Sequence, residues 1–238
     1  MTAFELAVQD AAGIAVAARV GADRVELASA LALGGLTPSP AVLERAVGSG
    51  TPVHVLVRPR AGGFAYDPDD RALMVADVRW AVREGAAGVV VGGTAAGTAD
   101  ADLVRACIDA ADGREVTFHR AFDTVSDRMA ALDALAELGI TRVLTSGGAS
   151  RAVDALAELR ALVERAAGCV QIMAGGGVDA VTARRVAAAG VDAVHASAKR
   201  VVVDDVPIGL GSASGAGGVA YETADEDAAL AIRLALAS

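Results

Sequence analysis

The stretch "GITRVLTSGG", residues 139–148, combines a glycine suited to ending a helix, a short link and a strand that itself ends in two glycines. Three similar stretches occur, "GADRVEL" from Gly21, "GAAGVVVGG" from Gly85 and "GVDAVHASA" from Gly190. In each, glycine permits the left-handed backbone that ends a helix, and a short apolar strand follows. The glycines recur at intervals of about 50 to 65 residues, which leaves room for two strand-helix units per repeat.

Four more strands are predicted between these repeats: "FELAV" from Phe4, "VHVLVRPR" from Val53, "VTFHRAF" from Val116 and "VQIMAGGG" from Val170. Alanine-rich helical stretches separate the strands, including Pro68 to Glu84, Ser126 to Leu138, Arg151 to Ala166 and Asp179 to Ala189. Eight strands alternating with helices in 238 residues predict a single α/β domain, residues 1–238, with a (β/α)8 TIM-barrel fold. A doubly wound open sheet is the alternative, but its Gly-rich fingerprint is missing from the first turn. The Gly/Ser-rich segment at about 204–221 predicts a flexible loop.

Composition excludes several classes of function. The net charge of −9 argues against binding to nucleic acid or to an anionic membrane surface, because both require a concentrated basic face. No apolar run approaches the roughly 20 residues that span a bilayer. The first ten residues do not resemble a secretion signal, so we expect a cytoplasmic protein. Cys107 and Cys169 form no metal or redox spacing.

The predicted strands alternate between an apolar face and a polar face. Because both faces of a barrel strand are buried, the apolar set is expected to meet the helices and the polar set to point into the lumen. A barrel built for stability alone would fill its lumen with branched aliphatic side chains. Here the residues expected in the lumen are Glu5, Glu26, His54, Arg58, Thr117, His119 and Gln171.

These lumen residues give the candidate catalytic set, His119, His54, Glu26 and Glu5. Ionisable groups that converge from different strands on one end of a barrel are typical of an active site. The alternative is a structural network of buried charges that satisfy one another. In "TFHRAFD", residues 117–123, the pleat predicts His119 in the lumen, whereas Arg120 either faces the helices or folds over the rim. Asp123 either caps the next helix or holds a ligand.

Glycine-rich strand ends indicate an anion site at the barrel mouth. "TSGGAS", "MAGGGVD" and "HASAKR" follow the sixth, seventh and eighth strands, and such ends let backbone N–H groups face a ligand. The alternative is that these glycines only turn the chain into the next helix. The expected substrate-binding residues are Arg58, Arg120, Thr145, Ser146, Gly175, Gly176, Gly177 and Ser197.

Six ordered motifs resemble those of the CutC family, the copper homeostasis proteins: "ELASALALGGLTPS", "VHVLVRPRAGGF", "TFHRAFD", "RVLTSGGA", "IMAGGGV" and "VHASA". The likeness runs from about residue 4 to about residue 199. It implies a cytoplasmic TIM barrel, copper handling and a homodimer. Family members that are proposed to bind Cu(I) carry cysteines where this chain has Ala7 and Ala28. Because Cu(I) prefers sulfur ligands, we expect this chain to lack that site.

Three functions follow from these observations. The first is an enzyme-like pocket for a small polar or anionic molecule, including a phosphorylated one, with His/Glu acid-base chemistry of the isomerase or lyase type and no firmly implied cofactor. The second is a divalent metal site made from Glu5, Glu26, His54 and His119. The third is a copper-binding homeostasis protein without catalysis, as the resemblance implies.

Overall fold

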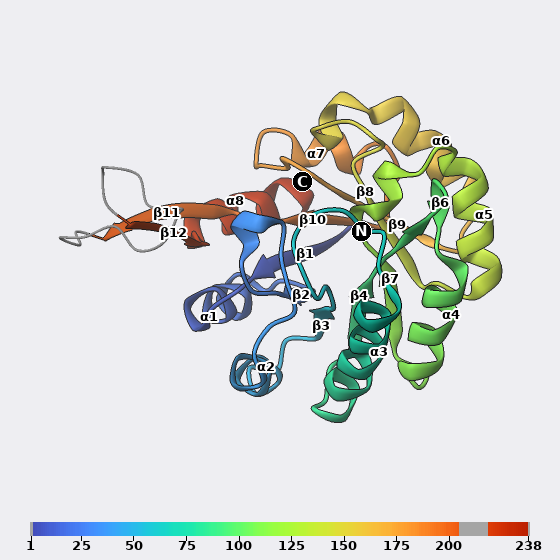
Figure 1. Ribbon diagram of the computed structural model, residues 1–238. Coiled ribbons are helices and arrows are strands. Elements are labelled where there is room, and N and C mark those ends of the chain that lie inside the picture. The colour runs from blue at the N-terminus through green and yellow to red at the C-terminus, as the bar shows by residue number, and fades with distance from the viewer. Residues whose placement is uncertain (1, 205–218, 238) are drawn as a thin grey trace.

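A computed structural model describes residues 2–204 and 219–237 and shows a closed barrel of eight parallel strands surrounded by helices (Figure 1). Around the barrel the strand order is β1-β10-β9-β8-β7-β4-β3-β2. The predicted TIM-barrel fold is therefore confirmed. The barrel strands are β1 Ala3–Val8, β2 Arg24–Leu27, β3 Val53–Leu56, β4 Gly88–Val91, β7 Glu115–Phe118, β8 Arg142–Thr145, β9 Gln171–Gly175 and β10 Ala193–Ala196.

The helices form the outer layer. They are α1 Ala11–Val20, α2 Pro40–Val47, α3 Pro68–Arg83, α4 Ala101–Ala110, α5 Arg128–Leu138, α6 Leu156–Ala166, α7 Ala183–Ala187 and α8 Glu226–Ala237. Shorter elements lie in the connections: the 3₁₀ turns η1 Leu31–Leu33, η2 Arg120–Thr124 and η3 Ala152–Asp154, and the small β5 Thr94–Ala95 and β6 Thr98–Ala99 hairpin.

The four repeat glycines adopt the left-handed backbone that the sequence predicts. Gly21, Gly85, Gly139 and Gly190 have φ angles of 64°, 95°, 88° and 91°. Three helices begin later than predicted, and the difference is small for α5, which begins at Arg128 instead of Ser126. Residues 152–154 form a 3₁₀ turn, so α6 begins at Leu156. The Asp179 carboxylate accepts hydrogen bonds from nearby backbone N–H groups, and this local turn replaces the first predicted turn of α7.

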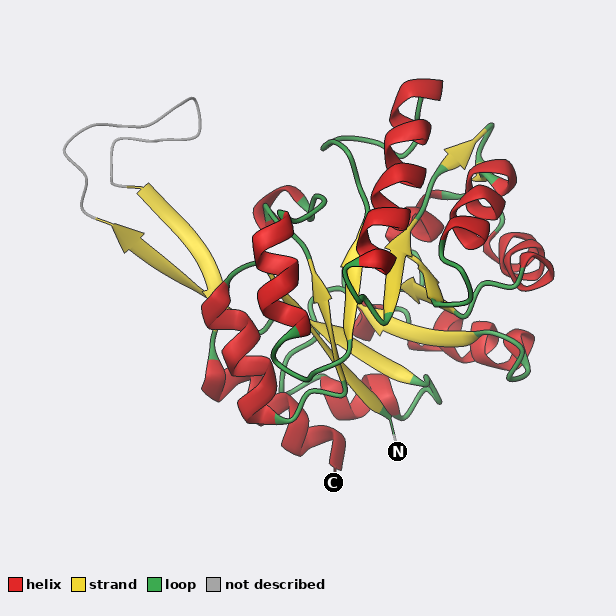
Figure 2. Ribbon diagram, turned by 90° about the horizontal axis from the view of Figure 1, so that it is seen from below, coloured by secondary structure: helices red, strands yellow, loops and turns green. Residues whose placement is uncertain are grey.

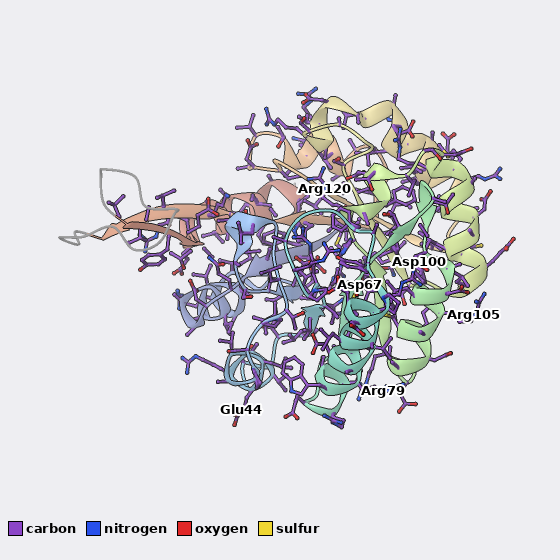
Figure 3. The ribbon with its side chains drawn as sticks, in the orientation of Figure 1. Glu44, Asp67, Arg79, Asp100, Arg105 and Arg120 are labelled. Atoms are coloured by element: carbon purple, nitrogen blue, oxygen red, sulfur yellow. The ribbon has the colours of Figure 1, made fainter. Side chains whose placement is uncertain are left out.

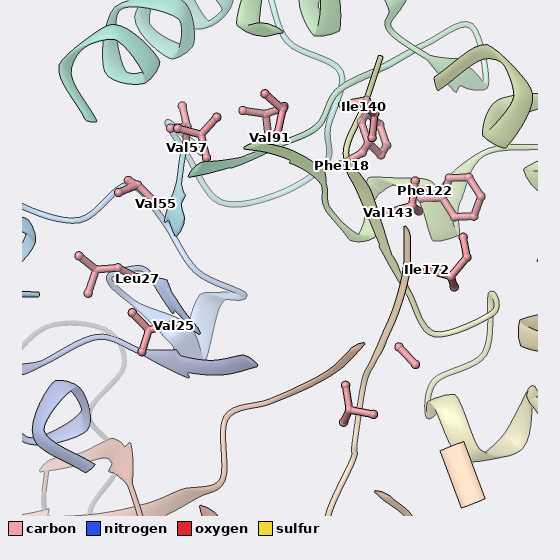
Figure 4. Close-up of a cluster of buried hydrophobic side chains, with 14 of the residues drawn as sticks. Val25, Leu27, Val55, Val57, Val91, Phe118, Phe122, Ile140, Val143 and Ile172 are labelled. Atoms are coloured by element: carbon pink, nitrogen blue, oxygen red, sulfur yellow. The ribbon is translucent and has the colours of Figure 1, made fainter. Parts of the chain in front are cut away.

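The main core lies between the strands and the helices. Val25 and Leu27 of β2, Val55 of β3 and Phe118 of β7 point outward into this layer (Figure 4). The residues that alternate with them point into the lumen, because successive strand side chains face opposite sides. Among the described residues, the apolar side chains in the lumen form only small clusters, such as that of Leu144 and Met173. Polar residues therefore occupy much of the barrel interior.

An antiparallel hairpin, β11 Lys199–Asp204 with β12 Val219–Ala224, projects from the barrel (Figures 1 and 2). The flexible loop predicted at about 204–221 overlaps these strands, and its residues 205–218 lie outside the described part of the chain. Within the described residues, no helix combines the length and apolar character needed to cross a bilayer. The cytoplasmic location and the homodimer stay predictions.

Candidate functional site

A cavity of about 260 Å³ opens at the carboxyl ends of the barrel strands. Leu31, Leu56, Phe64, Leu144 and Val178 give it apolar walls. Arg120, on η2, lies at its rim (Figure 3). The polar side chains that line the cavity are Glu26, Arg58, His119, Arg120, His195, Ser197 and Lys199.

Three charged or polar residues below the cavity form a connected group. Glu5, fully buried on β1, accepts a hydrogen bond from Arg24 Nε through one carboxylate oxygen. The other oxygen lies 2.8 Å from His195 Nδ1, so that nitrogen carries the proton of this hydrogen bond. Burial opposes the ionisation of Glu5, but the His195 hydrogen bond and the Arg24 charge outweigh it and lower the pKa of Glu5 well below its ordinary value. Glu5 is therefore a fixed anion.

Glu26 differs from Glu5 although both are buried glutamates in the lumen. Glu26 is 6% exposed and lines the cavity. No described group donates a hydrogen bond to its carboxylate. Burial is the main reason why the pKa of Glu26 rises to about 7, and the nearby Glu5 charge adds to the effect against the charges of His195 and Arg24. A carboxyl group in this state can take up and release a proton near neutral pH.

His195 faces both glutamates from β10. Burial disfavours its charged form, but Glu26 and the hydrogen bond to Glu5 outweigh this cost and raise the pKa of His195. Its side chain is partly exposed to the cavity. Together we call Glu5, Arg24, Glu26 and His195 the mouth cluster.

His119 is held as a neutral hydrogen-bond donor. Its Nδ1 accepts the backbone N–H of Ala121 at 3.1 Å, which leaves the proton of the neutral ring on Nε2. Burial, with the charge of Arg58, lowers the pKa of His119 to about 3. Nε2 is buried and has no hydrogen-bond partner among the described residues. A ligand oxygen in the cavity would supply the missing acceptor.

Glycine and aromatic neighbours fix the position of the His119 ring. A Cβ atom at Gly92 would lie 2.4 Å from the ring, so the position that directly follows β4 needs glycine. The Phe64 ring packs against the other side, with the two ring centroids 4.9 Å apart. Arg58 lies over Phe64, and its guanidinium donates to the carbonyls of Leu33, Gly35 and Gly62. Arg58 therefore holds two loops of the rim together and also contributes positive charge to the cavity.

Arg120 folds over the rim and pairs with Asp123. Its Nε donates to the Asp123 carboxylate at 2.8 Å, and Nη2 donates to Ser146 Oγ at 2.8 Å. Thr145 Oγ1 and the Ser146 backbone N–H also donate to Asp123. Thr145 and Ser146 thus organise the loop behind Arg120 and do not line the cavity. Asp123 holds this loop rather than capping the next helix, which Asp127 caps.

The glycines at the end of β9 and directly after it have two roles. Gly175 packs against His195, since a Cβ there would lie 3.2 Å from that side chain, and it does not line the cavity. Gly176 and Gly177 line it, together with Ser197 from the loop after β10. The backbone N–H groups of Gly176, Gly177 and Val178 donate to no acceptor in the described part of the chain.

His54 lies in a second polar group at the amino ends of the strands. Its Nε2 is 3.4 Å from Glu115, and it does not line the cavity. Arg142, 2% exposed, donates to Glu115, Gln171 and Thr117. We call these five residues the lower cluster. The structure thus places Glu26 and His119 on the cavity wall, whereas Glu5 and His54 lie in the lumen and do not line the cavity. His54 is the register neighbour of Glu26 on the adjacent strand.

Sequence reasoning missed His195, Arg142 and Lys199 as candidate site or lumen residues. The alternation in "AVHA", residues 193–196, carries the signal for His195, since Val194 faces the helices and the next residue must face the lumen. The same alternation places Arg142 opposite Val143. Lys199 lines the cavity from the base of the hairpin.

Three side chains of the mouth cluster offer donor atoms for a metal ion. One ligand atom each from Glu5, Glu26 and His195 lies within 4.8 Å of the others, a set that suits Zn²⁺ or Mn²⁺. Ala7 lines the cavity and Ala28 is buried, so the positions of the family cysteines offer methyl groups. No sulfur atom lines the cavity within the described residues. The residues present therefore do not fit Cu(I).

These observations define the chain as a (β/α)8-barrel protein with a charged pocket at the carboxyl ends of its strands. The CutC family model matches residues 2–200, so the chain belongs to the CutC family. A CutC family protein of Caulobacter vibrioides is 47% identical over 176 residues, 74% of this chain and 72% of that protein. One from Pasteurella multocida is 36% identical over 86% of this chain and 85% of that protein. The crystal structure of CutC from Streptococcus agalactiae superposes with a TM-score of 0.79 at 30% identity, covering 83% of this chain and 99% of that one.

Proposed function

We propose that the chain is an enzyme that transfers a proton at the carbon next to the carbonyl of a small anionic compound, as an isomerase or a lyase does. One observation carries the proposal. A buried glutamate without a hydrogen-bond partner and a neutral histidine with an unpartnered N–H line the same cavity. Buried polar groups without partners are unfavourable for stability, and in native proteins they concentrate where a ligand completes them.

Glu26 and His119 have different roles in the proposed reaction. Glu26, as the carboxylate, removes a proton from the carbon, and the electron pair of the broken C–H bond moves toward the carbonyl oxygen. His119 Nε2–H donates a hydrogen bond to that oxygen and stabilises the negative charge that develops. In an isomerase, the proton of the hydroxyl group on the deprotonated carbon passes to the former carbonyl oxygen, and the Glu26 carboxyl group returns its proton to the former carbonyl carbon. In a lyase, the electron pair moves back from the oxygen, the bond between the next carbon and the leaving group breaks, and the Glu26 carboxyl group protonates the leaving group. No external oxidant or reductant is needed.

The neutral state of His119 supports this role. A neutral imidazole donates to an enolate oxygen without first losing a positive charge, and its depressed pKa keeps it neutral at any physiological pH. The raised pKa of Glu26 makes its carboxylate a stronger base than an exposed glutamate. Glu5, Arg24 and His195 hold Glu26 in a fixed electrostatic environment.

The test is proton exchange in deuterium oxide, followed by NMR. Phosphorylated and carboxylated ketones and aldehydes of three to five carbons are incubated with the protein, and loss of the C–H signal next to the carbonyl is measured. We expect exchange with at least one compound and a loss of about 100-fold or more in Glu26→Gln. Glu164→Gln changes an exposed glutamate on α6 and serves as the matched control. The proposal fails if the wild-type protein accelerates exchange in no compound, or if Glu26→Gln exchanges as fast as wild type.

A second candidate is a divalent metal site, which the spacing of Glu5, Glu26 and His195 favours. Both Glu5 oxygens already accept Arg24 or contact His195, so a cation would have to displace the proton shared with His195. Titration calorimetry with Zn²⁺ and Mn²⁺ separates the two candidates. Stoichiometric binding that His195→Gln abolishes supports the metal site, and absence of binding removes it. A noncatalytic copper carrier is the weakest candidate, because the cavity offers no sulfur ligand for Cu(I).

A further inference from the structure

The side chains that line the cavity are mostly basic, although the molecule is acidic. The protein carries a net charge of −9, yet Glu26 is the only acidic side chain among the described lining residues. Of the basic lining residues, Arg120 pairs with Asp123, Lys199 with Glu222 and His195 with Glu5. Arg58 has no carboxylate partner among the described residues, so its charge favours an anion in the cavity.

One wall of the cavity contains several hydrogen-bond donors. We call it the β9–β10 wall: Gly176, Gly177, Val178, Ser197, Lys199 and the adjoining Arg120. Lys199 Nζ donates to Glu222 at 2.6 Å. The wall's three backbone N–H groups, from residues 176–178, donate to no described acceptor. Gly176 and Gly177 have φ angles of 110° and 63°, which side chains rarely adopt. Successive N–H groups in such a turn form a concave site for an anion.

Arg120 completes this wall. Its Nε and Nη2 are used by Asp123, Ser146 and Ala149, but Nη1 has no hydrogen-bond partner among the described residues. A Cβ atom at Gly176 would lie 3.4 Å from Nη1 and 3.2 Å from Ser146 Cβ. Because Gly176 has no side chain, a space remains beside the unpartnered Nη1 of Arg120. An oxyanion in that space would meet N–H donors from the backbone and from Arg120.

Two further donors lie away from this wall. His119 follows β7, two strands from β9 in the closed ring of eight, and Arg58 follows β3, four strands from β9. A ligand that accepts hydrogen bonds both from the β9–β10 wall and from these donors must therefore carry two separate acceptor groups. The cavity of about 260 Å³ corresponds to the volume of roughly nine water molecules, which suits a compound of three or four carbons with one phosphate.

We infer that the substrate is a small phosphate ester that contains a carbonyl group, with its phosphate on the β9–β10 wall and its carbonyl oxygen at His119. This inference rests on the proposed proton transfer and names the substrate class for it. Three backbone N–H groups and Arg120 Nη1 surround the anion from several directions. This arrangement matches the three terminal oxygens of a phosphate ester better than the planar pair of a carboxylate.

The test measures the affinity of inorganic phosphate by calorimetry and the shifts of the Gly176 and Gly177 amide signals by NMR. We expect saturable binding with shifts at both glycines, and a loss of affinity of about tenfold or more in Arg120→Met. Lys199→Met removes an exposed charge from the same wall and gives a second variant that should fold. Arg165→Met, which removes an exposed ion pair with Asp133 on the outer helices, is the matched control and should bind phosphate as wild type does.

Three results would overturn the inference: unchanged phosphate affinity in both Arg120→Met and Lys199→Met, shifts that leave Gly176 and Gly177 unaffected, or acetate binding as tightly as phosphate. The exchange assay separates this failure from failure of the proposed function. Exchange restricted to compounds without phosphate would contradict the phosphate wall and leave proton transfer in place. Phosphate bound at the wall, with no exchange in any compound, would leave the wall in place and contradict proton transfer.

Discussion

The two polar clusters inside the barrel contain the same kinds of residue but differ in whether their unpartnered groups face the cavity. In the lower cluster, Arg142 donates to three side chains, and Glu115 accepts from Arg142 beside His54. His54 Nδ1 lacks a partner among the described residues, but His54 does not line the cavity. At the mouth, the Glu26 carboxylate and His119 Nε2 also lack partners among the described residues, and both side chains line the cavity. The comparison indicates that unpartnered groups that face a cavity, rather than residue type, separate a functional cluster from a structural one.

The pKa values follow the same division. Although burial opposes it, the hydrogen bond and charge of Arg142 lower the pKa of Glu115, which makes that carboxylate a stable anion. The pKa of Glu26 rises to about 7, because burial is not offset by any hydrogen bond. Of these two glutamates, Glu26 in the mouth cluster is therefore the one suited to proton transfer near neutral pH.

The largest effect is expected from Arg142→Met in the lower cluster. The substitution leaves Thr117 and Gln171 in the lumen without their donor and Glu115 without its counter-charge. We expect the free energy of unfolding to fall by about 4 kcal/mol in urea denaturation. Arg165→Met breaks an exposed ion pair and should cost less than about 1 kcal/mol. Equal losses in the two variants would show that the lower cluster does not stabilise the barrel.

His54 should make the barrel sensitive to acid. Burial, with the charges of Arg142 and Arg24, lowers its pKa from 6.5 to about 4 against the effects of Glu5 and Glu115. Because the folded state prefers the neutral ring, this contribution to stability is present above pH 6.5 and is lost as the pH falls toward 4. The loss attributable to His54 is up to about 3 kcal/mol.

Urea denaturation of wild type and His54→Gln at pH 7 and pH 4.5 isolates this contribution. The wild type should lose more stability than the variant between the two pH values, while the depressed pKa of His119 contributes to the loss in both. Parallel losses in the two proteins would mean that His54 does not titrate in this range.

Much of the fold could be predicted because its signals are local. Helix-ending glycines and alternating apolar residues are visible in short stretches, and both determine the barrel. The same alternation places Glu5, Glu26 and His119 in the lumen. It cannot show the height of a side chain along the barrel axis, so His54 stands beside His119 in the predicted catalytic set although in the structure it lies beside Glu115 and does not line the cavity.

Partners from distant strands could not be predicted either. The contact of Glu5 with His195 joins residues 190 positions apart, and it depends on closure of the barrel between β1 and β10. Likewise, Thr145 and Ser146 were predicted to bind substrate, but Asp123 accepts their hydrogen bonds from across a loop. Which buried polar groups stay unpartnered depends on these tertiary contacts.

Gly92→Ala should give a smaller effect that is specific to the mouth. The added methyl group would lie 2.4 Å from the His119 ring and must displace it. We expect a loss of about 2 kcal/mol in the free energy of unfolding and loss of proton exchange. Gly63→Ala, where a Cβ atom would meet no heavy atom within 4 Å, is the control and should retain both. An unchanged exchange rate in Gly92→Ala would contradict the role given to the position of His119.

The free energy of unfolding of Glu26→Gln at pH 8 tests the central claim most directly. If Glu26 is kept for proton transfer, its buried carboxylate costs stability when ionised, and the neutral amide should leave the protein as stable as wild type or more stable, by about 1 kcal/mol. Arg142→Met provides the contrast from the lower cluster under the same conditions. A decrease of more than about 2 kcal/mol in Glu26→Gln would show that Glu26 holds the barrel together, as the lower cluster does, and would contradict the account.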